Sequence, residues 1–202
     1  MKPTYLLTAL LSLATLHAVT AADLKPIILD HELPVLAAPS FKEPLEAPWS
    51  VAKGKWTPKD GILEVLDVPA DKHIPVLHHK IGLASASIDV EFLMDGPGTF
   101  LVGCDSDKHI GRVVITAAGM SIAEDSVKPS HTIAKLKTPV KVGEWHKLHV
   151  EWTRDQMAAN LDGQELRAQH SFLATAKSRS WLAAGKKVQV RNLTIRGEEA
   201  KP

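Results

Sequence analysis

The sequence has little of several features that define other protein classes. Cys104 is the one cysteine, so no disulfide can form within the chain. Lys and Arg number 24 against 23 Asp and Glu, so the chain has no strong positive field for a phosphate backbone, and we expect no nucleic-acid partner. Hydrophobic residues make up 45% and charged residues 23%, which excludes a wholly disordered or collagen-like chain. What remains is a globular protein stabilised by its core.

A long apolar run occurs at the N-terminus, where Lys2 precedes residues 5–16, and Val19 and Ala21 fit a cleavage site. The run is shorter than the ~20 apolar residues of a membrane-spanning helix. We therefore predict a signal peptide over residues 1–21, cleaved after Ala21, and a secreted or periplasmic protein without a membrane span after cleavage. An uncleaved anchoring helix is the alternative. The remaining 181 residues would carry 23 basic and 23 acidic side chains.

Proline marks the next segment. Five prolines fall within residues 22–48, a density that opposes both helix interiors and central strands. We predict an extended lead there, with Ile27 to Leu29 as an edge strand. The main domain is expected over residues 49–197, followed by a polar tail over residues 198–202.

The main domain reads as short strands separated by turns. Residues 86–94 and 145–153 alternate between apolar and polar side chains, which predicts strands with one buried face. Asp-Gly pairs at 60–61 and 162–163 predict tight hairpins, and a change of alternation near Asn192 predicts a β-bulge. With almost no helical pattern, the chain is predicted to be all-β, an antiparallel sandwich or barrel.

Two further features refine the predicted strands. Gly96-Pro97-Gly98 is expected to end the strand that begins at Ala86, and residues 172–180 have a short stretch of helical composition.

Five segments have the character of fold markers: Trp56 with Asp60 to Leu63, Ile88 to Phe92, Gly143 to Leu148, Leu161 to Gly163 and Val190 to Leu193. Together they resemble the concanavalin A-like lectin/glucanase superfamily, over roughly residues 45–197. Within it, their order is similar to the LamG-like jelly rolls and the 3-keto-disaccharide hydrolase-like domains of secreted bacterial proteins. The resemblance implies an antiparallel jelly-roll β-sandwich. The Tyr-Glu-x-Gln strand of the hydrolase-like group and the Glu-x-Asp-x-x-Glu strand of the glucanases do not occur here.

One candidate site is the polar face of two strands. Asp89 and Glu91 share a face of one strand, and His149 and Glu151 share a face of another. If the strands are neighbours, these groups would converge, with Glu91, His149 and Glu151 as catalytic candidates for acid/base work on a glycosidic bond and Asp89 as a ligand contact. A solvated sheet face would have the same pattern, so both interpretations stay open.

A second candidate is the segment from Cys104 to Arg112. Asp105 and Asp107 could provide oxygen ligands to a divalent cation such as calcium, although no cofactor is predicted for the fold itself. His109 and Arg112 could contact a bound sugar or carboxylate. A solvated loop is again the alternative. Cys104 itself is expected to be a buried small hydrophobe.

The five tryptophans divide by position. Trp56, Trp145 and Trp152 lie in predicted strands and are assigned to the core. Trp49 and Trp181 adjoin predicted loops and are expected to expose their rings, with Trp181 as a ligand contact.

Three functions remain open from the sequence. The first is a secreted carbohydrate-associated module that binds glycans or has a structural role, with a carbohydrate or glycan-bearing surface as its partner. The second is a glycoside-processing enzyme of the 3-keto-disaccharide hydrolase type. The third is an extracellular protein-interaction module without a sugar ligand. The oligomeric state has no signal in the sequence.

Overall fold

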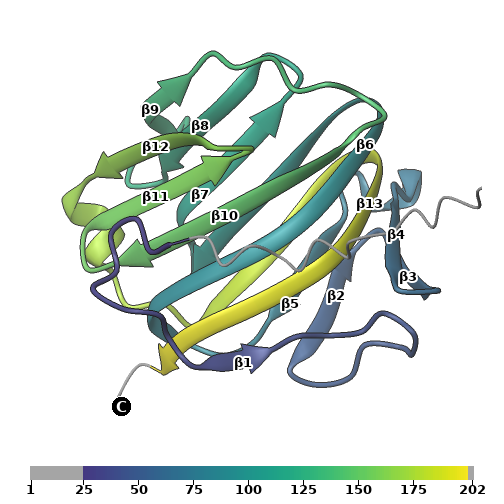
Figure 1. Cartoon of the computed structure of the whole chain (residues 1–202), viewed down its shortest axis with the longest axis horizontal. Coiled ribbons are helices and arrows are strands. Elements are labelled where there is room, and N and C mark those ends of the chain that lie inside the picture. Colours follow the sequence, from purple (N-terminus) through teal and green to yellow (C-terminus); the bar gives the residue numbers. More distant parts are fainter. Residues whose placement is uncertain (1–24, 200–202) are drawn as a thin grey trace, which may run out of the picture.

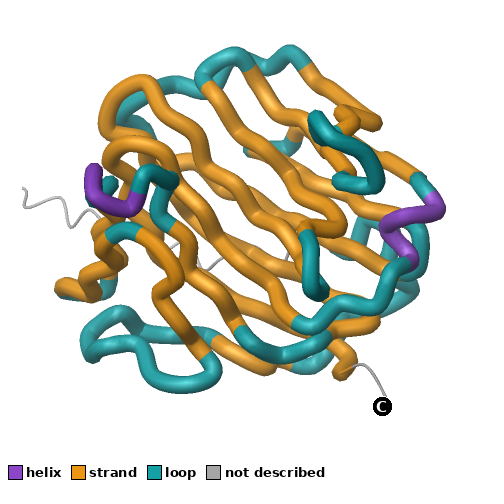
Figure 2. Tube along the Cα trace, turned by 180° about the vertical axis from the view of Figure 1, so that it is seen from behind, coloured by secondary structure: helices purple, strands orange, loops and turns teal. Residues whose placement is uncertain are grey.

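Antiparallel strands make up most of residues 25–199, the part of the chain that the computed structural model describes. Figure 2 shows strands across the molecule, with helix limited to two short 3-10 turns, η1 (Pro69–Asp71) and η2 (Ser171–Ala174). The predicted all-β class is confirmed. The strands are β1 (Val35–Ala37), β2 (Trp49–Lys53), β3 (Lys55–Lys59), β4 (Ile62–Leu66), β5 (Val76–His79), β6 (Leu83–Asp105), β7 (His109–Thr116), β8 (Gly119–Glu124), β9 (His131–Leu136), β10 (Trp145–Thr153), β11 (Gln156–Leu161), β12 (Gln164–Gln169) and β13 (Arg179–Glu199).

Two long strands, β6 and β13, pair along nearly their whole length and take part in both layers of the sandwich (Figure 1). One layer has the order β12-β11-β10-β6-β13-β4-β3. In the other layer, the remaining half of β6 pairs with β7, and the remaining half of β13 pairs with β5. The layer continues from β7 to β8 and β9 on one side and from β5 to β2 on the other. This arrangement joins the two layers through continuous backbone.

The two long strands change register where they pass between the layers. Asp95 pairs with Lys187 and Thr99 with Gly185, so three residues of β6 lie opposite one of β13. The backbones come close here, because a Cβ added at Gly98 would lie 2.4 Å from the carbonyl oxygen of Gly185. Gly96-Pro97-Gly98 therefore does not end the strand, as the sequence had suggested, and instead forms an irregularity within it.

The core lies between the layers and contains the apolar face of each alternating strand. Residues that the alternation placed on this face are at most 3% exposed: Ile88, Val90 and Phe92 from β6, and Leu148, Val150 and Trp152 from β10. The opposite faces of β6 and β10 carry the polar residues. Burial of this apolar surface is the main source of stability in a fold without disulfides.

The predicted turns and the predicted bulge are confirmed. Asp60 and Gly61 have φ of 51° and 86°, and Asp162 and Gly163 have φ of 49° and 88°. Positive φ at both positions is the geometry of the type I′ turn that matches the twist of a hairpin. Asn192 has φ of 50° and lies where the register of β13 shifts between Arg191 and Thr194.

Two local predictions are wrong, and a third is met only in part. Ile27 to Leu29 form bends and not an edge strand. The strand that the N-terminal lead contributes is β1, which pairs with β13. In residues 172–180, helix is limited to η2, and strand β13 begins at Arg179. Trp145 is half-buried, and the guanidinium of Arg191 lies 4.0 Å from its ring centre.

The predicted signal peptide, residues 1–21, lies outside the described residues. Among residues 25–199, no helix has the length and apolarity to cross a membrane. Cys104 is free and fully buried, as predicted, and burial raises the pKa of its thiol to about 12.

Candidate functional site

The register of β6 and β10 brings the predicted polar residues together. His149 pairs directly with Asp89, Lys147 with Glu91, and Glu151 with Ser87. Since the side chains of alternate residues point to the same face of a strand, Asp89, His149 and Glu151 share the outer face of this layer. The convergence that the sequence made conditional on neighbouring strands is therefore present.

The imidazole of His149 lies between two carboxylates. Its Nδ1 is 2.6 Å from Oδ1 of Asp89, and its Nε2 is 2.7 Å from Oε1 of Glu151. Burial alone would lower the pKa of His149, but the two hydrogen bonds and the two negative charges outweigh it and raise the pKa to about 9. His149 is therefore an imidazolium at neutral pH that donates from both nitrogens.

The N-terminal segment covers Glu151. The backbone N–H groups of Ile27, Ile28 and Leu29 donate to its carboxylate over 2.7 to 3.1 Å, and its side chain is fully buried. Three successive N–H groups around one carboxylate form an anion-binding nest. Burial would raise the pKa of Glu151, but the hydrogen bonds from His149 and the nest hold it below its ordinary value. Residues 25–33 lie over this face of the sheet in Figure 1.

Two arginines of β13 complete the charge balance on this face. Arg196 donates from Nη1 to Asp89 over 2.8 Å and forms an ion pair with Glu32. Arg191 donates to Glu91 over 2.7 Å. Desolvation would raise the pKa of Glu91, but the hydrogen bonds from Arg191 and Asn192 hold it below its ordinary value. Each carboxylate therefore already has a cationic partner.

A small pocket of about 90 Å³ lies between this polar face and the N-terminal segment. This volume is well below the roughly 300–1,000 Å³ of typical ligand pockets and is enough for a few water molecules. Of the predicted site residues, it gathers Asp89, Glu91, His149 and Glu151.

The structure places the other predicted site residues elsewhere, around β7 and the start of β13. Asp105 is buried and accepts hydrogen bonds from Nε1 of Trp181 over 2.6 Å and from His109 over 2.9 Å. The hydrogen bond with Asp105 raises the pKa of His109. Asp107 is exposed on the adjoining turn, and Arg112 is hydrogen-bonded to Asp125 and Ser130.

Trp181 does not expose its ring, contrary to the prediction. It is 5% exposed and lies opposite Gly103 in the register of β6 and β13. A Cβ added at Gly103 would lie 2.3 Å from the ring, so the glycine provides the space that the indole fills. The indole N–H then satisfies the buried carboxylate of Asp105.

Sequence reasoning missed a larger groove of about 670 Å³ at one end of the β6–β10 face. Its volume lies within the range of small-molecule sites. Leu29 and His31 line both this groove and the small pocket, so the N-terminal segment forms the wall between them. The polar residues that line the groove are Asp30, His31, Ser85, Thr153, Arg154, Gln156, Thr175, Lys177 and Glu198.

The groove combines rigid and exposed polar groups. The hydroxyls of Ser85 and Thr153 are 2.9 Å apart across β6 and β10. Lys177 donates from Nζ to the carbonyls of Leu173 and Thr175, and burial lowers its pKa. Arg154 is exposed at the β10–β11 turn. No sequence pattern links these positions, because they come from the lead, four strands, the β10–β11 turn and the segment after η2.

Comparisons with known proteins agree on the fold. No family model matches the chain, and no curated protein matches it. A Bacillus subtilis protein with a galectin-like fold superposes with a TM-score of 0.61 at 9% identity, over 84% of this chain and 99% of that one. The carbohydrate-binding module CBM66 from Bacillus subtilis superposes with a TM-score of 0.52 at 14% identity, over 75% and 92%.

A sialidase superposes with a TM-score of 0.60 at 7% identity, over 86% of this chain but 19% of the sialidase. The chain thus spans about a fifth of that protein. Together with the strand order, these likenesses show that the chain has the concanavalin A-like jelly-roll fold that its sequence resembles. Fold alone does not assign function.

Proposed function

We propose that this protein is a secreted, non-catalytic module that binds carbohydrate in the groove at the end of the β6–β10 face. The observation that carries the proposal is the groove itself, with about 670 Å³ of space and charged and hydroxyl side chains on several sides. Sugars present many hydroxyls, and they are recognised by side chains such as Asp, Arg and Gln that donate or accept in fixed directions. Asp30, Arg154 and Gln156 supply such groups.

The pKa values of the titratable groups on the outer face favour binding over catalysis. An acid/base catalyst works best with a pKa near the operating pH. Hydrogen bonds and charges raise the pKa of His149 to about 9 and hold those of Glu91 and Glu151 below their ordinary values. The catalytic candidates thus have poor acid/base properties at neutral pH, and the nest around Glu151 keeps substrate away from it.

We assign the cluster of Asp89, His149 and Glu151 a positioning role. By binding the backbone of Ile27 to Leu29, it holds the segment whose next residues, Asp30 and His31, line the groove. Preorganised walls reduce the entropy lost on binding. The carbohydrate-binding module among the structural neighbours supports the ligand class, although the likeness itself is one of fold.

The test is a glycan screen of the purified mature protein, with 3-keto-glycosides included, followed by titration calorimetry and product analysis of each hit. We expect binding without turnover. Arg154→Asn and Gln156→Ala should each weaken binding at least about fivefold, which corresponds to the loss of one hydrogen bond to a ligand of about 1 kcal/mol or more. Asn suits position 154 because Arg154 has a φ of 50°, a conformation that Asn tolerates.

The matched control is Arg167→Asn, which removes the same charge from an exposed residue of β12 that pairs with Glu165 outside the groove. It should leave affinity unchanged. Turnover of a 3-keto-glycoside by the wild-type protein would establish the hydrolase alternative in place of our proposal. Failure to bind any glycan would overturn the proposal and leave the protein-interaction alternative.

A further inference from the structure

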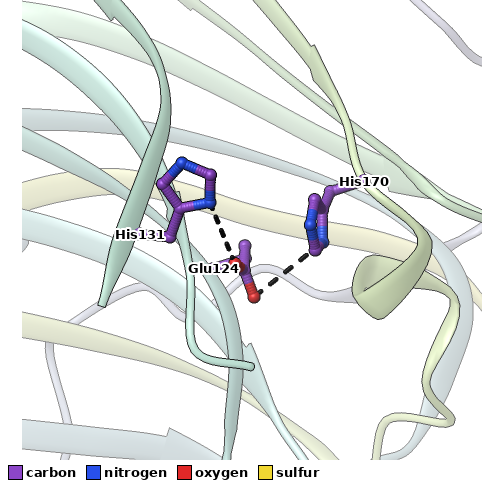
Figure 3. A group of neighbouring side chains, drawn as sticks. All are labelled: Glu124, His131 and His170. Atoms are coloured by element: carbon purple, nitrogen blue, oxygen red, sulfur yellow. Dashed lines mark ion pairs between the residues drawn. The ribbon is translucent and has the colours of Figure 1, made fainter. Parts of the chain in front are cut away.

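Glu124, His131 and His170 form a cluster outside the groove and outside the polar face of β6 and β10 (Figure 3). Glu124 ends β8 and His131 begins β9, where the two residues are a directly opposed cross-strand pair. His170 follows β12 and immediately precedes η2. The three side chains therefore come from three separate elements and point toward one another.

The spacing of their donor atoms suits one small metal ion. Nδ1 of His131 lies 3.3 Å from Oε1 of Glu124, and Nδ1 of His170 lies 3.8 Å from Oε2. One potential ligand atom from each residue lies within 4.8 Å of the others. Ligand atoms that each lie about 2.1 Å from a tetrahedral ion are about 3.4 Å from one another. Modest shifts of the two imidazoles would therefore bring all three ligand atoms within bonding distance of one ion.

The negative charge of Glu124 is also incompletely balanced. The side chain of Glu124 is fully buried. Its carboxylate accepts hydrogen bonds from the backbone N–H and the hydroxyl of Ser126, over 2.6 Å and 2.9 Å. Within residues 25–199, its ion-pair partners are the two imidazoles. The guanidinium of Arg112, on the neighbouring strand β7, is engaged by Asp125. A buried anion without a permanent cation is costly, and a bound cation would remove that cost.

We propose that Glu124, His131 and His170 bind a divalent transition-metal ion of the zinc class. Two imidazoles and one carboxylate favour zinc and similar ions over calcium, which takes six to eight oxygen ligands. His131 and His170 keep 56% and 32% of their side chains exposed, which leaves access for the ion and room for water ligands. This site is distinct from Asp105 and Asp107, which the sequence suggested for calcium.

Such an ion would tie the β8–β9 hairpin to η2. His170 already accepts a long 3.3 Å hydrogen bond from the N–H of Phe172 at Nδ1, so ligation exchanges a weak contact for a metal bond or turns the ring to present Nε2. Ala174, the last residue of η2, and the next three residues, Thr175 to Lys177, line the groove. The metal would therefore stabilise one wall of the groove, although the metal site itself does not rest on the proposed function.

The test is calorimetric titration of the tag-free protein with ZnCl₂ at neutral pH, with no glycan present. We expect one ion per chain, displacement by a chelator, and no comparable binding of CaCl₂ or MgCl₂. His131→Ala and His170→Ala should each weaken zinc binding at least about tenfold, since even residues that merely orient a ligand contribute that much. With CoCl₂, the wild-type protein should show visible absorption bands that both variants lose.

The matched control is His73→Ala, because His73 is an exposed histidine bonded to the backbone of Ile74 and removed from the cluster. It should bind zinc as the wild type does. Circular dichroism of each variant checks that it is folded, which is expected since His131 and His170 are partly exposed. Zinc binding that survives both cluster variants, zinc binding lost in His73→Ala, or calcium binding in place of zinc would each overturn the proposal.

Discussion

Glu151 accepts a hydrogen bond of 2.7 Å from the backbone N–H of Ile28, a residue 123 positions earlier in the chain. This contact joins the beginning of the described chain to the outer face of the β6–β10 layer. It satisfies a buried carboxylate and at the same time holds the segment that separates the small pocket from the groove.

Glu151→Gln should destabilise the fold by about 3 kcal/mol. The change leaves the imidazolium of His149 with one counter-ion and weakens three hydrogen bonds to the nest, and breaking a buried pair is costly. Urea unfolding measures the loss, and limited proteolysis should show faster cleavage near residues 25–32. Glu165→Gln, which removes an exposed carboxylate on β12, is the matched control and should change stability by less than about 1 kcal/mol.

Stability should fall as the pH rises from 6.5 to 9. The pKa of His149 is about 9 in the folded protein and 6.5 in a model compound. The folded state therefore binds the proton more tightly, and this contribution is complete below pH 6.5 and lost as pH rises through 9. The shift corresponds to about 3 kcal/mol. Urea unfolding at a series of pH values should show this decline in the wild type and a flatter profile in His149→Gln; identical profiles would contradict the assignment.

The thiol of Cys104 should not react in the folded protein. Burial raises its pKa to about 12, so at pH 8 almost no thiolate is present, and the sulfur is inaccessible as well. A chromogenic disulfide reagent should release colour only after denaturant is added, with one equivalent per chain. Rapid reaction without denaturant would show that the core around β6 and β7 opens readily.

Gly98→Ala should destabilise the protein by about 2 kcal/mol. The added Cβ would lie 2.4 Å from the carbonyl oxygen of Gly185, and neither backbone can move without disturbing the pairing of β6 and β13. Thermal unfolding provides the measurement. Gly143→Asn is the control, because position 143 has open space around it and a φ of 82° that Asn accepts more easily than other residues; it should have a smaller effect.

The sequence predicted the fold well because local signals determine much of it. Alternation in β6 and β10 identified the buried faces, and positive φ at Asp60 and Asp162 follows from their Asp-Gly pairs. The family resemblance predicted the jelly-roll fold. The alternation also placed the polar candidates on the face opposite the core: Asp89, Glu91, His149 and Glu151. Their meeting depended on strand order, which alternation does not specify.

The rest depends on long-range packing that leaves no local pattern. The nest at Ile27 to Leu29 uses backbone N–H groups, which every residue except proline has, so no side-chain pattern marks it. Trp181 is buried because Gly103 happens to be its cross-strand partner. Glu124 and His170 are 46 positions apart, and their meeting follows from the packing of β12 against β8.

The most direct test of the central claim is to map a bound glycan by NMR on the isotope-labelled protein. We expect chemical-shift changes to concentrate on the groove, at residues 29–31, at Ser85 and at residues 153–156. We also expect Glu151→Gln to weaken binding of the same glycan, because the N-terminal wall is then no longer held. Changes centred on another surface, such as the β3–β4 hairpin or residues 125–130, would show that the groove is not the binding site.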